Sequence, residues 1–438
     1  MYNKDKTLHR LLYHIYSHHR IVALFYHLLT GNLWKPSHVK ILVSDLLDRR
    51  AEPQDNVVHC KAALQWLFRA QDVAKVGGVA AEYNFSWGWS LPYPEVSGYI
   101  IPTMLNLARQ FTSEFNTKEI KTRASSIADW LVAIQHADGS YQSGLYYDAK
   151  VHGRRPLAQR VTVGGESWAF ETGQILCGLS AMYEETSEKR YLSGGVKAAD
   201  WLVQQQLADG TWACEGQGVP VSFSTLTARH LASLAKVTGK KKYEEAAIKN
   251  CNWALSQQNN AGWFNACSHT PGFPPWTHGI GYAAQGLLET GICLGKDEYI
   301  EGVLKAADAL LRVYSLKGFK SVYRQEKGFL PARFSSAWRS KDNFSCLVGN
   351  AQIALVWSIL YQVTNDIRFL NGALKINHDL KSLQVLESPN FGIAGGIKGS
   401  HPIWGMYRTF GYPAWAAKFF IDALIAEEQA LRKLRGGI

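Results

Sequence analysis

The feature that most constrains the fold is an alternation of two kinds of helix-forming segment along nearly the whole chain. One kind is apolar on almost every side, as buried helices are, and is predicted at 94–111, 168–185, 223–238, 276–289, 347–363 and 412–428. The other kind is amphipathic and is predicted at 59–70, 120–135, 191–206, 243–258, 299–314 and 369–383. Six buried helices that alternate with six amphipathic ones close most simply into a ring.

The amphipathic segments also share short sequence motifs. Ala-Asp-Trp-Leu-Val occurs at 128–132 and again at 199–203, and related phrases occupy the same place in the other segments. Self-similarity at a period of about 52 to 70 residues indicates repeated helical hairpins. The sequence therefore predicts an all-α protein, an (α/α)6 toroid of six helical hairpins over residues 56–438, with an extra N-terminal helical arm over residues 1–55.

The links between the predicted helices differ in length according to their direction. Links from a buried to an amphipathic helix are short, whereas the opposite links are long and occupy 72–93, 136–167, 207–222, 259–276, 317–346 and 384–411. The alternation places all the long links on one face of the ring. Long loops in a compact domain are usually functional, so this face is the candidate binding face.

Aromatic and basic residues are frequent in and beside these long links. The chain contains 15 Trp and 12% aromatic residues, and flat aromatic rings are suitable platforms for sugars. Guanidinium groups match carboxylate or sulfate groups, although a basic run is also typical of a merely solvated face. Substrate binding is predicted for Trp87, Trp89, Tyr93, Arg154, Arg155, Arg160, Trp168, Trp276, Arg324, Arg333, Trp338, Arg339, Trp404, Tyr407, Arg408 and Tyr412.

His278 and Tyr282 form the first candidate catalytic set. They stand four residues apart at the start of a buried helix, so both side chains lie on one face near its mouth. Proton abstraction next to a uronate carboxylate needs a base of near-neutral pKa, an acid, and a cation or amide on the carboxylate. Asn350, at the start of the next buried helix, offers such an amide.

Three carboxylates form the second candidate set. Glu95, Glu166 and Glu171 occur where buried helices start. A glycoside hydrolase needs two carboxylates, about 5 Å apart for retention or about 6.5 to 9.5 Å for inversion, and the sequence does not give that distance. Acidic residues in a first turn also stabilise a helix N-terminus without any catalytic role.

Four phrases resemble those of toroidal proteins encoded in bacterial surface-polysaccharide gene clusters, over about residues 57 to 430. They are Tyr93-Pro-Glu-Val-Ser-Gly-Tyr, Thr277-His-Gly-Ile-Gly-Tyr-Ala-Ala-Gln-Gly, Val348-Gly-Asn-Ala-Gln and Tyr412-Pro-Ala-Trp-Ala-Ala-Lys. More distantly, the chain is similar to the helical domain of glucuronyl C5-epimerases and to toroidal polysaccharide lyases and glycosidases. The resemblance implies a toroid and a role in polysaccharide biosynthesis, but fold does not fix chemistry.

Charge and cysteine usage suggest partners and compartment. A formal charge of +11 implies an anionic partner, and no nucleic-acid module is recognisable, so an acidic polysaccharide or oligosaccharide is expected. Seven scattered cysteines argue against a disulfide framework. No cleavable signal and no membrane span are apparent. We therefore expect a cytoplasmic protein. The basic, aromatic segment 8–29 is interpreted first as an arm packed on the toroid, and the alternative is contact with the inner membrane surface or a partner.

No metal or cofactor is assigned, because the five histidines of the arm lack accompanying acids or cysteines. Three functions remain open. The first is uronate C5 proton abstraction by His278 and Tyr282, in an epimerase or lyase. The second is glycoside hydrolysis by Glu95 with Glu166 or Glu171. The third is non-catalytic binding of a glycan during its assembly.

Overall fold

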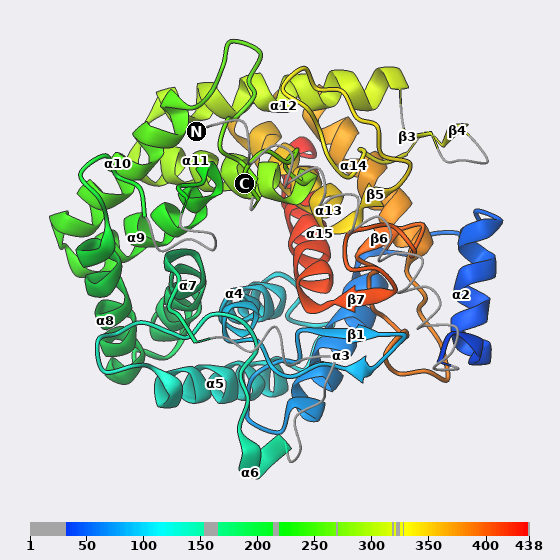
Figure 1. Ribbon diagram of the computed structural model, residues 1–438, viewed down its shortest axis with the longest axis horizontal. Helices are drawn as coiled ribbons and strands as arrows, with labels where there is room; N and C mark the ends of the chain where they lie inside the picture. Colours follow the sequence, from blue (N-terminus) through cyan, green and yellow to red (C-terminus); the bar gives the residue numbers. More distant parts are fainter. Residues whose placement is uncertain are drawn as a thin grey trace, which may run out of the picture.

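A computed structural model describes residues 32–152, 165–212, 219–268, 270–317, 319–320, 325–326 and 328–436. Seen along its shortest axis, the chain forms two concentric layers of helices (Figure 1). This arrangement confirms the predicted all-α toroid. The predicted N-terminal helical arm falls on residues 1–31 for the most part, and these lie outside the described residues.

The inner layer contains the helices that the sequence predicts to be buried. Each inner helix contacts the next one around the ring, and the last one contacts the first. Their N-terminal ends follow the long links, as the sequence predicts. The inner helices are α4 (Pro94–Gln110), α7 (Ala169–Thr186), α9 (Thr225–Thr238), α11 (Thr277–Leu294), α13 (Leu347–Thr364) and α15 (Ala414–Leu434).

The outer layer contains the amphipathic helices, each packed on an inner helix. The outer helices are α3 (Asn56–Ala74), α5 (Thr117–Ile134), α8 (Lys189–Gln205), α10 (Lys241–Ser256), α12 (Asp297–Lys317) and α14 (Ile367–Leu383). Five of them pair with the inner helix that precedes them in the chain, whereas α3 pairs with α15. The ring therefore closes where the first outer helix meets the last inner helix.

The sequence motif repeated in the outer helices has a structural reason. The Asp of the repeated Ala-Asp-Trp phrase accepts a hydrogen bond from a Tyr at the start of the next outer helix, as Tyr191 Oη donates to Asp129 at 2.8 Å. Gln135, at the end of the same helix, donates to the carbonyl oxygens of Gly139 and Gly194, both at 2.9 Å. Tyr243 donates in the same way to Asp200, and Tyr299 to Asn252. Gln206 and Gln258 each donate to two backbone carbonyl oxygens, as Gln135 does. These residues thus connect neighbouring outer helices.

Short strands join the long links, and the sequence analysis did not predict them. β1 (Glu82–Asn84) pairs antiparallel with β2 (Gly88–Trp89) and with β7 (Gly411–Pro413), with Tyr83 opposite Tyr412. β5 (Ser345–Cys346) pairs with β6 (Ser400–His401), and β3 (Phe319–Lys320) pairs with β4 (Gln325–Glu326). The β1 and β7 pair fastens the same seam at which α3 meets α15.

The remaining elements are short helices. They are η1 (Asn32–Trp34), α2 (Pro36–Leu46), α6 (Ala149–His152) and η3 (Ser222–Ser224). Among the described residues, α13 is the one helix long and apolar enough to span a membrane, and 78% of its apolar window is buried inside the ring. The toroid itself explains that apolar composition.

The inner helices α4 and α7 approach each other through two glycines. A Cβ atom on Gly178 would lie 2.3 Å from the carbonyl oxygen of Gly98, and one on Gly98 would lie 2.6 Å from the Cα atom of Ile175. Contacts this short involve backbone atoms, so no side-chain rotation relieves them. The two helices can pack this closely only because neither position has a side chain.

We therefore expect Gly178→Ala to lower the free energy of unfolding by about 1–3 kcal/mol, because overpacking outweighs the gain of about 1 kcal/mol in helix propensity. Urea unfolding followed by circular dichroism measures this change. Gly165→Ala is the matched control, since its Cβ atom would meet nothing within 4 Å. Equal stability of the two variants would contradict the proposed close approach.

Candidate functional site

A cavity of about 720 Å³ opens at the N-terminal ends of the inner helices. Its lining comes mainly from the first turns of α4, α7, α11 and α15 and from the links that precede them. The residues share aromatic or ionisable character for the most part and are Tyr93, Glu95, Tyr99, Trp168, Phe170, Glu171, Val219, Val221, Phe223, Thr270, Trp276, His278, Tyr282, Tyr407, Arg408 and Trp415. The predicted binding face and the cavity thus coincide.

Two carboxylates meet in this cavity on either side of one phenol. Glu95 and Glu171 lie in the first turns of the neighbouring helices α4 and α7. The Tyr93 hydroxyl donates to Glu171 Oε1 at 2.5 Å, and it also lies close enough to the Glu95 carboxyl group to affect its pKa. Glu171 Oε2 accepts a second hydrogen bond from the Gly144 backbone N–H at 2.9 Å. Tyr93 therefore bridges the two acids.

The environment of Glu95 favours its neutral form. Burial raises the pKa of the Glu95 carboxyl to about 7, against the opposing effects of the Tyr93 hydrogen bond and of the charges on Arg408 and Lys418. A carboxyl group with a pKa near 7 is suited to transfer protons at neutral pH.

His278 and Tyr282 also lie in the cavity, side by side as their spacing predicts. Their rings are 4.1 Å apart between centroids. The side-chain amide of Gln352 lies 2.9 Å from His278 Nδ1, which fixes the orientation of the imidazole. Burial raises the pKa of Tyr282 well above its usual range, so the phenol remains protonated near neutral pH. The neighbouring Tyr99 hydroxyl opposes part of this effect on the pKa of Tyr282.

Arg408 is the only Arg or Lys among the described residues that line the cavity. Its guanidinium lies 4.6 Å from the centre of the Trp415 ring, and its Nε atom is 3.6 Å from Glu82 Oε2. The side chain is 38% exposed, which leaves part of the guanidinium open to a ligand. Trp415 in turn donates through its indole N–H to Tyr407 Oη at 2.9 Å. A cation and aromatic faces therefore lie close together.

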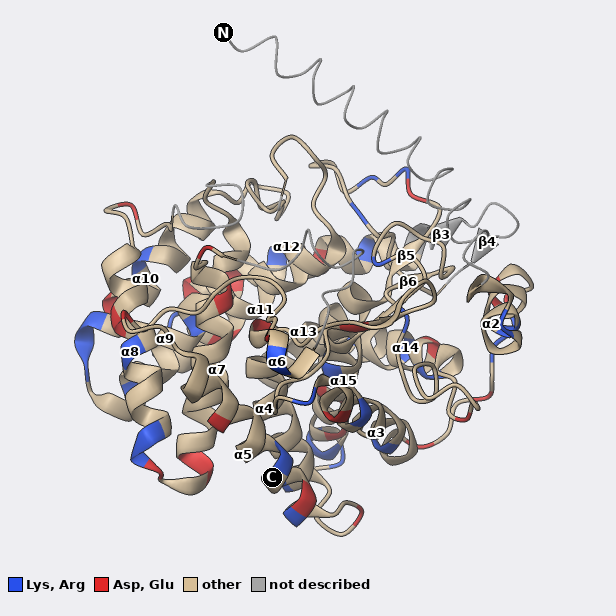
Figure 2. Ribbon diagram, turned by 60° about the horizontal axis from the view of Figure 1, so that its bottom comes forward, with Lys and Arg blue, Asp and Glu red and all other residues tan. Residues whose placement is uncertain are grey.

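The rest of the positive charge is not gathered at the cavity. Lys and Arg are spread over several outer helices and α2 (Figure 2). The predicted binding residues Arg154, Arg155, Arg160 and Arg324 lie outside the described residues, as does the segment 8–29. Within the described part of the chain, Arg408 is thus the residue that represents, in the cavity lining, the basic side chains predicted for the binding face.

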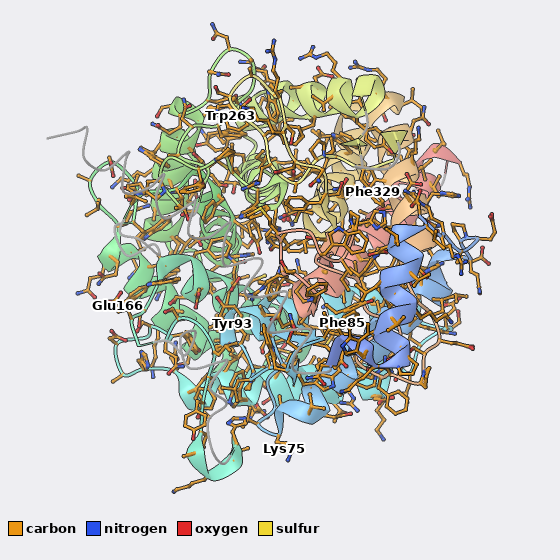
Figure 3. All side chains as sticks on the ribbon, turned by 45° about the vertical axis from the view of Figure 1, so that its right-hand side comes forward. Lys75, Phe85, Tyr93, Glu166, Trp263 and Phe329 are labelled. Atoms are coloured by element: carbon orange, nitrogen blue, oxygen red, sulfur yellow. The ribbon has the colours of Figure 1, made fainter. Side chains whose placement is uncertain are left out.

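Several predicted residues lie away from the cavity. Glu166 is exposed and is labelled at the edge of the molecule, whereas Tyr93 lies toward its middle (Figure 3). Asn350 is fully buried, and its amide bonds to the backbone of Leu330 at 2.8 and 3.1 Å and to the Cys346 carbonyl at 2.9 Å. This amide supports the link before α13. The structure does not bring it to the ligand space.

Other predicted binding residues have structural contacts. Arg333 forms a bidentate pair with Asp342 and lies 5.0 Å from the Trp276 ring centre, so it supports Trp276 from outside the cavity lining. Trp89 packs on Trp66 at 5.0 Å. Tyr412 is buried and lines a different cavity. Trp87, Trp338, Arg339 and Trp404 are likewise absent from the lining.

The sequence analysis did not single out Tyr99, Trp415 and Lys418. Tyr99 stands four residues after Glu95, the same spacing that identified His278 and Tyr282, so that signal was available. Lys418 is 6% exposed, pairs with Asp422 at 2.7 Å, and lies 5.0 Å from the Tyr99 ring centre. The sequence signal for Lys418 was a cationic residue within an otherwise apolar, buried helix.

A second, smaller cavity of about 200 Å³ is lined in part by Tyr99, which also lines the first cavity, and by Lys418. There Arg229 pairs with Glu289, and its guanidinium also donates to His230 Nδ1 at 3.0 Å. Arg is a donor only, so His230 must donate through Nε2 to Gln174 Oε1, also at 3.0 Å. Burial, with the charge of Arg229, keeps the pKa of His230 well below its usual range.

Across the described ranges, no group of three or more His, Cys, Asp or Glu side chains is placed to hold a metal ion. The six described cysteines, Cys60, Cys177, Cys251, Cys267, Cys293 and Cys346, are all free thiols.

No protein-family model and no curated protein sequence matches this chain. Solved structures do. An unsaturated glucuronyl hydrolase specific for heparin has a TM-score of 0.64 at 15% identity, over 87% of this chain and 98% of that one. A family 76 glycoside hydrolase from a bovine Bacteroides thetaiotaomicron strain has a TM-score of 0.60 at 12% identity, over 87% and 78%.

A cellobiose 2-epimerase from Bacillus thermoamylovorans B4167 has a TM-score of 0.60 at 11% identity, over 89% of this chain and 99% of that one. Identities this low show a common fold. The class defined by the fold is therefore the α/α toroid, and its members named here perform more than one reaction on sugars.

Proposed function

We propose that this protein is a carbohydrate-active enzyme that hydrolyses a glycosidic bond in an acidic oligosaccharide or polysaccharide bound in the ring cavity. The observation that supports this most is the pair Glu95 and Glu171, bridged by Tyr93 and open to a cavity with aromatic walls. Two carboxyl groups that flank one bond are the requirement for most glycoside hydrolases.

The two acids have different environments, which suits different roles. Neutral Glu95 would protonate the glycosidic oxygen as the bond to the anomeric carbon breaks. Glu171, held by the Gly144 N–H and the Tyr93 hydroxyl, would form the new bond to that carbon. Water then attacks the same carbon while Glu95 takes up its proton, so the carboxylate of Glu171 and the proton on Glu95 are both restored.

The stereochemical outcome follows from the spacing of the acids. Tyr93 interacts with both carboxyl groups, so the two acids lie close together. Retaining enzymes have a separation of about 5–5.5 Å and inverting enzymes about 6.5–9.5 Å. We therefore expect retention of configuration, which NMR of the first-formed product measures.

The acidic nature of the substrate is inferred from the cavity and from the neighbours. Arg408 presents a partly exposed guanidinium beside the carboxyl pair, and such a group suits a uronate carboxylate. Solved neighbours include unsaturated glucuronyl hydrolases, one of them complexed with dGlcA-GalNAc6S. A role in making a bacterial surface polysaccharide follows only from the four phrases that resemble proteins of such gene clusters.

The experiment is incubation of the purified protein with a panel of uronate-containing and neutral oligosaccharides, with new reducing ends as the readout. Release of reducing ends from uronate substrates is the expected result. Release from neutral substrates alone would contradict the acidic substrate class. Binding of the glycans without turnover would contradict the enzyme assignment and leave a glycan-binding protein.

Tyr93→Phe tests the bridge. Loss of a hydrogen bond to a charged group should lower kcat about ten- to a hundredfold. Because the Tyr93 hydrogen bond lowers the pKa of Glu95, the variant should also shift the alkaline limb of the pH–rate profile to higher pH. Tyr141→Phe is the control, since the buried Tyr141 hydroxyl has no partner within the described ranges. An unshifted limb would show that Tyr93 is merely structural.

A second function is supported by a separate observation, the stacked pair His278 and Tyr282 in the same cavity. His278 would take the C5 proton of a uronate, the protonated Tyr282 would return one, and Arg408 would neutralise the carboxylate. Deuterium entering C5 from heavy water without unsaturated product would indicate an epimerase, and unsaturated product would indicate a lyase. Either signal, sensitive to His278→Gln and not to Glu95→Gln, would replace the hydrolase proposal.

A further inference from the structure

Helix α2 is fastened to the outside of the toroid by one face. Its inward side chains His38, Ile41 and Asp45 are buried. His38 Nε2 is 3.0 Å from Tyr83 Oη, and its ring stacks on Phe85 at 3.9 Å. These contacts fix α2 at the outer edge of the ring, beside the seam strands (Figure 1).

Asp45 strengthens this attachment with a buried ion pair. It pairs with Lys398, both side chains being 4% exposed, and accepts a hydrogen bond from the Ile403 backbone N–H at 2.7 Å. The only acid within α2 is thus turned inward and neutralised. The opposite face of the helix is left without negative charge.

The outward face of α2 is apolar. Val43, Leu46 and Leu47 follow the helical spacing of three and four residues and are 38%, 52% and 48% exposed, and Trp34 just before the helix is 65% exposed. An amphipathic helix on a soluble protein normally turns its apolar side to the core and its polar side to water. Here the inward side combines His38 and Asp45 with Ile41, whereas Val43, Leu46 and Leu47 face outward.

Cations border this apolar face. Lys35 and Lys40 are exposed on either side of the start of α2. The sequence contains no acid between Asp5 and Asp45, whereas it contains Lys6, Arg10, Arg20, Lys35 and Lys40 in that span. Apolar residues with a Trp at the helix end and flanking lysines are typical of helices that lie in a membrane interface.

We propose that the outward face of α2, formed by Trp34, Val43, Leu46 and Leu47 with Lys35 and Lys40, docks the toroid on an anionic lipid surface. The leucines enter the boundary between headgroups and acyl chains, and the lysines contact acidic headgroups. A second copy of the chain fits less well. A two-fold contact through this face would place each lysine near its own equivalent.

The consequence for the enzyme is orientation. Because His38 and Asp45 fix α2 to the ring, the whole toroid is held at one angle to the bilayer when α2 docks. This inference does not depend on which reaction the cavity performs, since α2 contributes no residue to the cavity lining.

The experiment is co-sedimentation of the full chain with vesicles of phosphatidylcholine, with or without phosphatidylglycerol. Leu46→Gln/Leu47→Gln should lower the partition coefficient on phosphatidylglycerol vesicles at least about tenfold, because two apolar side chains no longer enter the interface. Lys35→Gln/Lys40→Gln should weaken binding about fivefold per lysine at low salt and leave little salt dependence. Vesicles of phosphatidylcholine alone should bind weakly.

The matched control is Leu207→Gln/Ile292→Gln, which removes two aliphatic side chains that are each 46% exposed elsewhere on the toroid. It should bind vesicles as the unaltered protein does, and thermal unfolding of all variants checks that they fold. Equal binding by the α2 and control variants would overturn the proposal, since another segment would then make the contact. Concentration-dependent dimerisation that Leu46→Gln/Leu47→Gln abolishes, without vesicle binding, would also overturn it in favour of a second copy.

Discussion

Glu95→Gln should lower kcat by about 10²–10⁴-fold, the usual contribution of a positioned proton donor. The amide fills the same space but has no acidic proton, so the leaving oxygen departs unprotonated. In the unaltered enzyme, kcat/KM should fall above about pH 7, where Glu95 loses its proton. The residual activity of the variant should lack that limb. Steady-state kinetics across pH measures both effects.

Stability provides an independent readout for the same variant. The folded-state pKa of Glu95 lies above its unfolded value of about 4.3. A raised carboxyl pKa means that the folded state holds its proton more tightly, so stability is lost as pH rises from the unfolded pKa toward the folded one. Glutamine cannot ionise and avoids this loss. Glu95→Gln should therefore be less active and yet more stable than the unaltered protein at pH 8.

Glu166→Gln is the matched control, because it makes the same chemical change at a residue that is exposed at the edge of the molecule, away from the cavity. It should leave kcat and the pH profile unchanged. If Glu166→Gln and Glu95→Gln lost activity equally, the assignment of Glu95 as the proton donor would be wrong.

Asp45→Asn should lower the free energy of unfolding by about 3–5 kcal/mol, because it leaves the Lys398 charge buried without its partner. Burial alone would raise the pKa of Asp45, but the charges of Lys398 and His401 and their hydrogen bonds outweigh it and hold the pKa well below its usual range. A depressed carboxyl pKa stabilises the fold above the unfolded value of about 3.9, and this stabilisation fades as pH falls below that value.

The difference between Asp45→Asn and the unaltered protein should accordingly be full at neutral pH and shrink on acidification below about pH 4. Urea unfolding at several pH values measures it. Glu298→Gln removes one acid of an exposed pair with Lys296, in which the side chains are 54% and 39% exposed, and should cost about 0–1 kcal/mol at most. A small effect of Asp45→Asn at pH 7 would show that α2 is not fastened by this pair.

The fold was predictable because its signal is periodic and repeated. The predicted segment 347–363 and the observed α13 (Leu347–Thr364) differ by one residue at one end, since a helix apolar on all sides has few alternative boundaries. The strands were not predictable. β1 and β7 are each three residues long, and their pairing joins parts of the chain that only ring closure brings together.

The site was predictable in its residue types and less so in its geometry. Glu166 and Glu171 are five residues apart and both precede or begin a buried helix, yet only Glu171 turns inward, because α7 starts at Ala169. Asn350 occupies an equivalent place on α13, but the backbone of Leu330 takes up its amide. Which polar group at a helix start faces the axis depends on the partner that the preceding link supplies, and links of irregular conformation leave no periodic signal.

The ring can close only after α15 has been synthesised, because it closes where α3 meets α15. α3 leaves the ribosome long before α15, yet α3 packs on α15 and β1 pairs with β7. At about 5–20 residues per second, α3 waits tens of seconds for its partner. Contacts between the ends of a chain also slow folding. The nascent chain therefore exposes the apolar side of α3 and the open edge of α4 until α15 has been synthesised. Chaperone binding during translation, and aggregation of chains truncated before Ala414, are the expected behaviour in the cell.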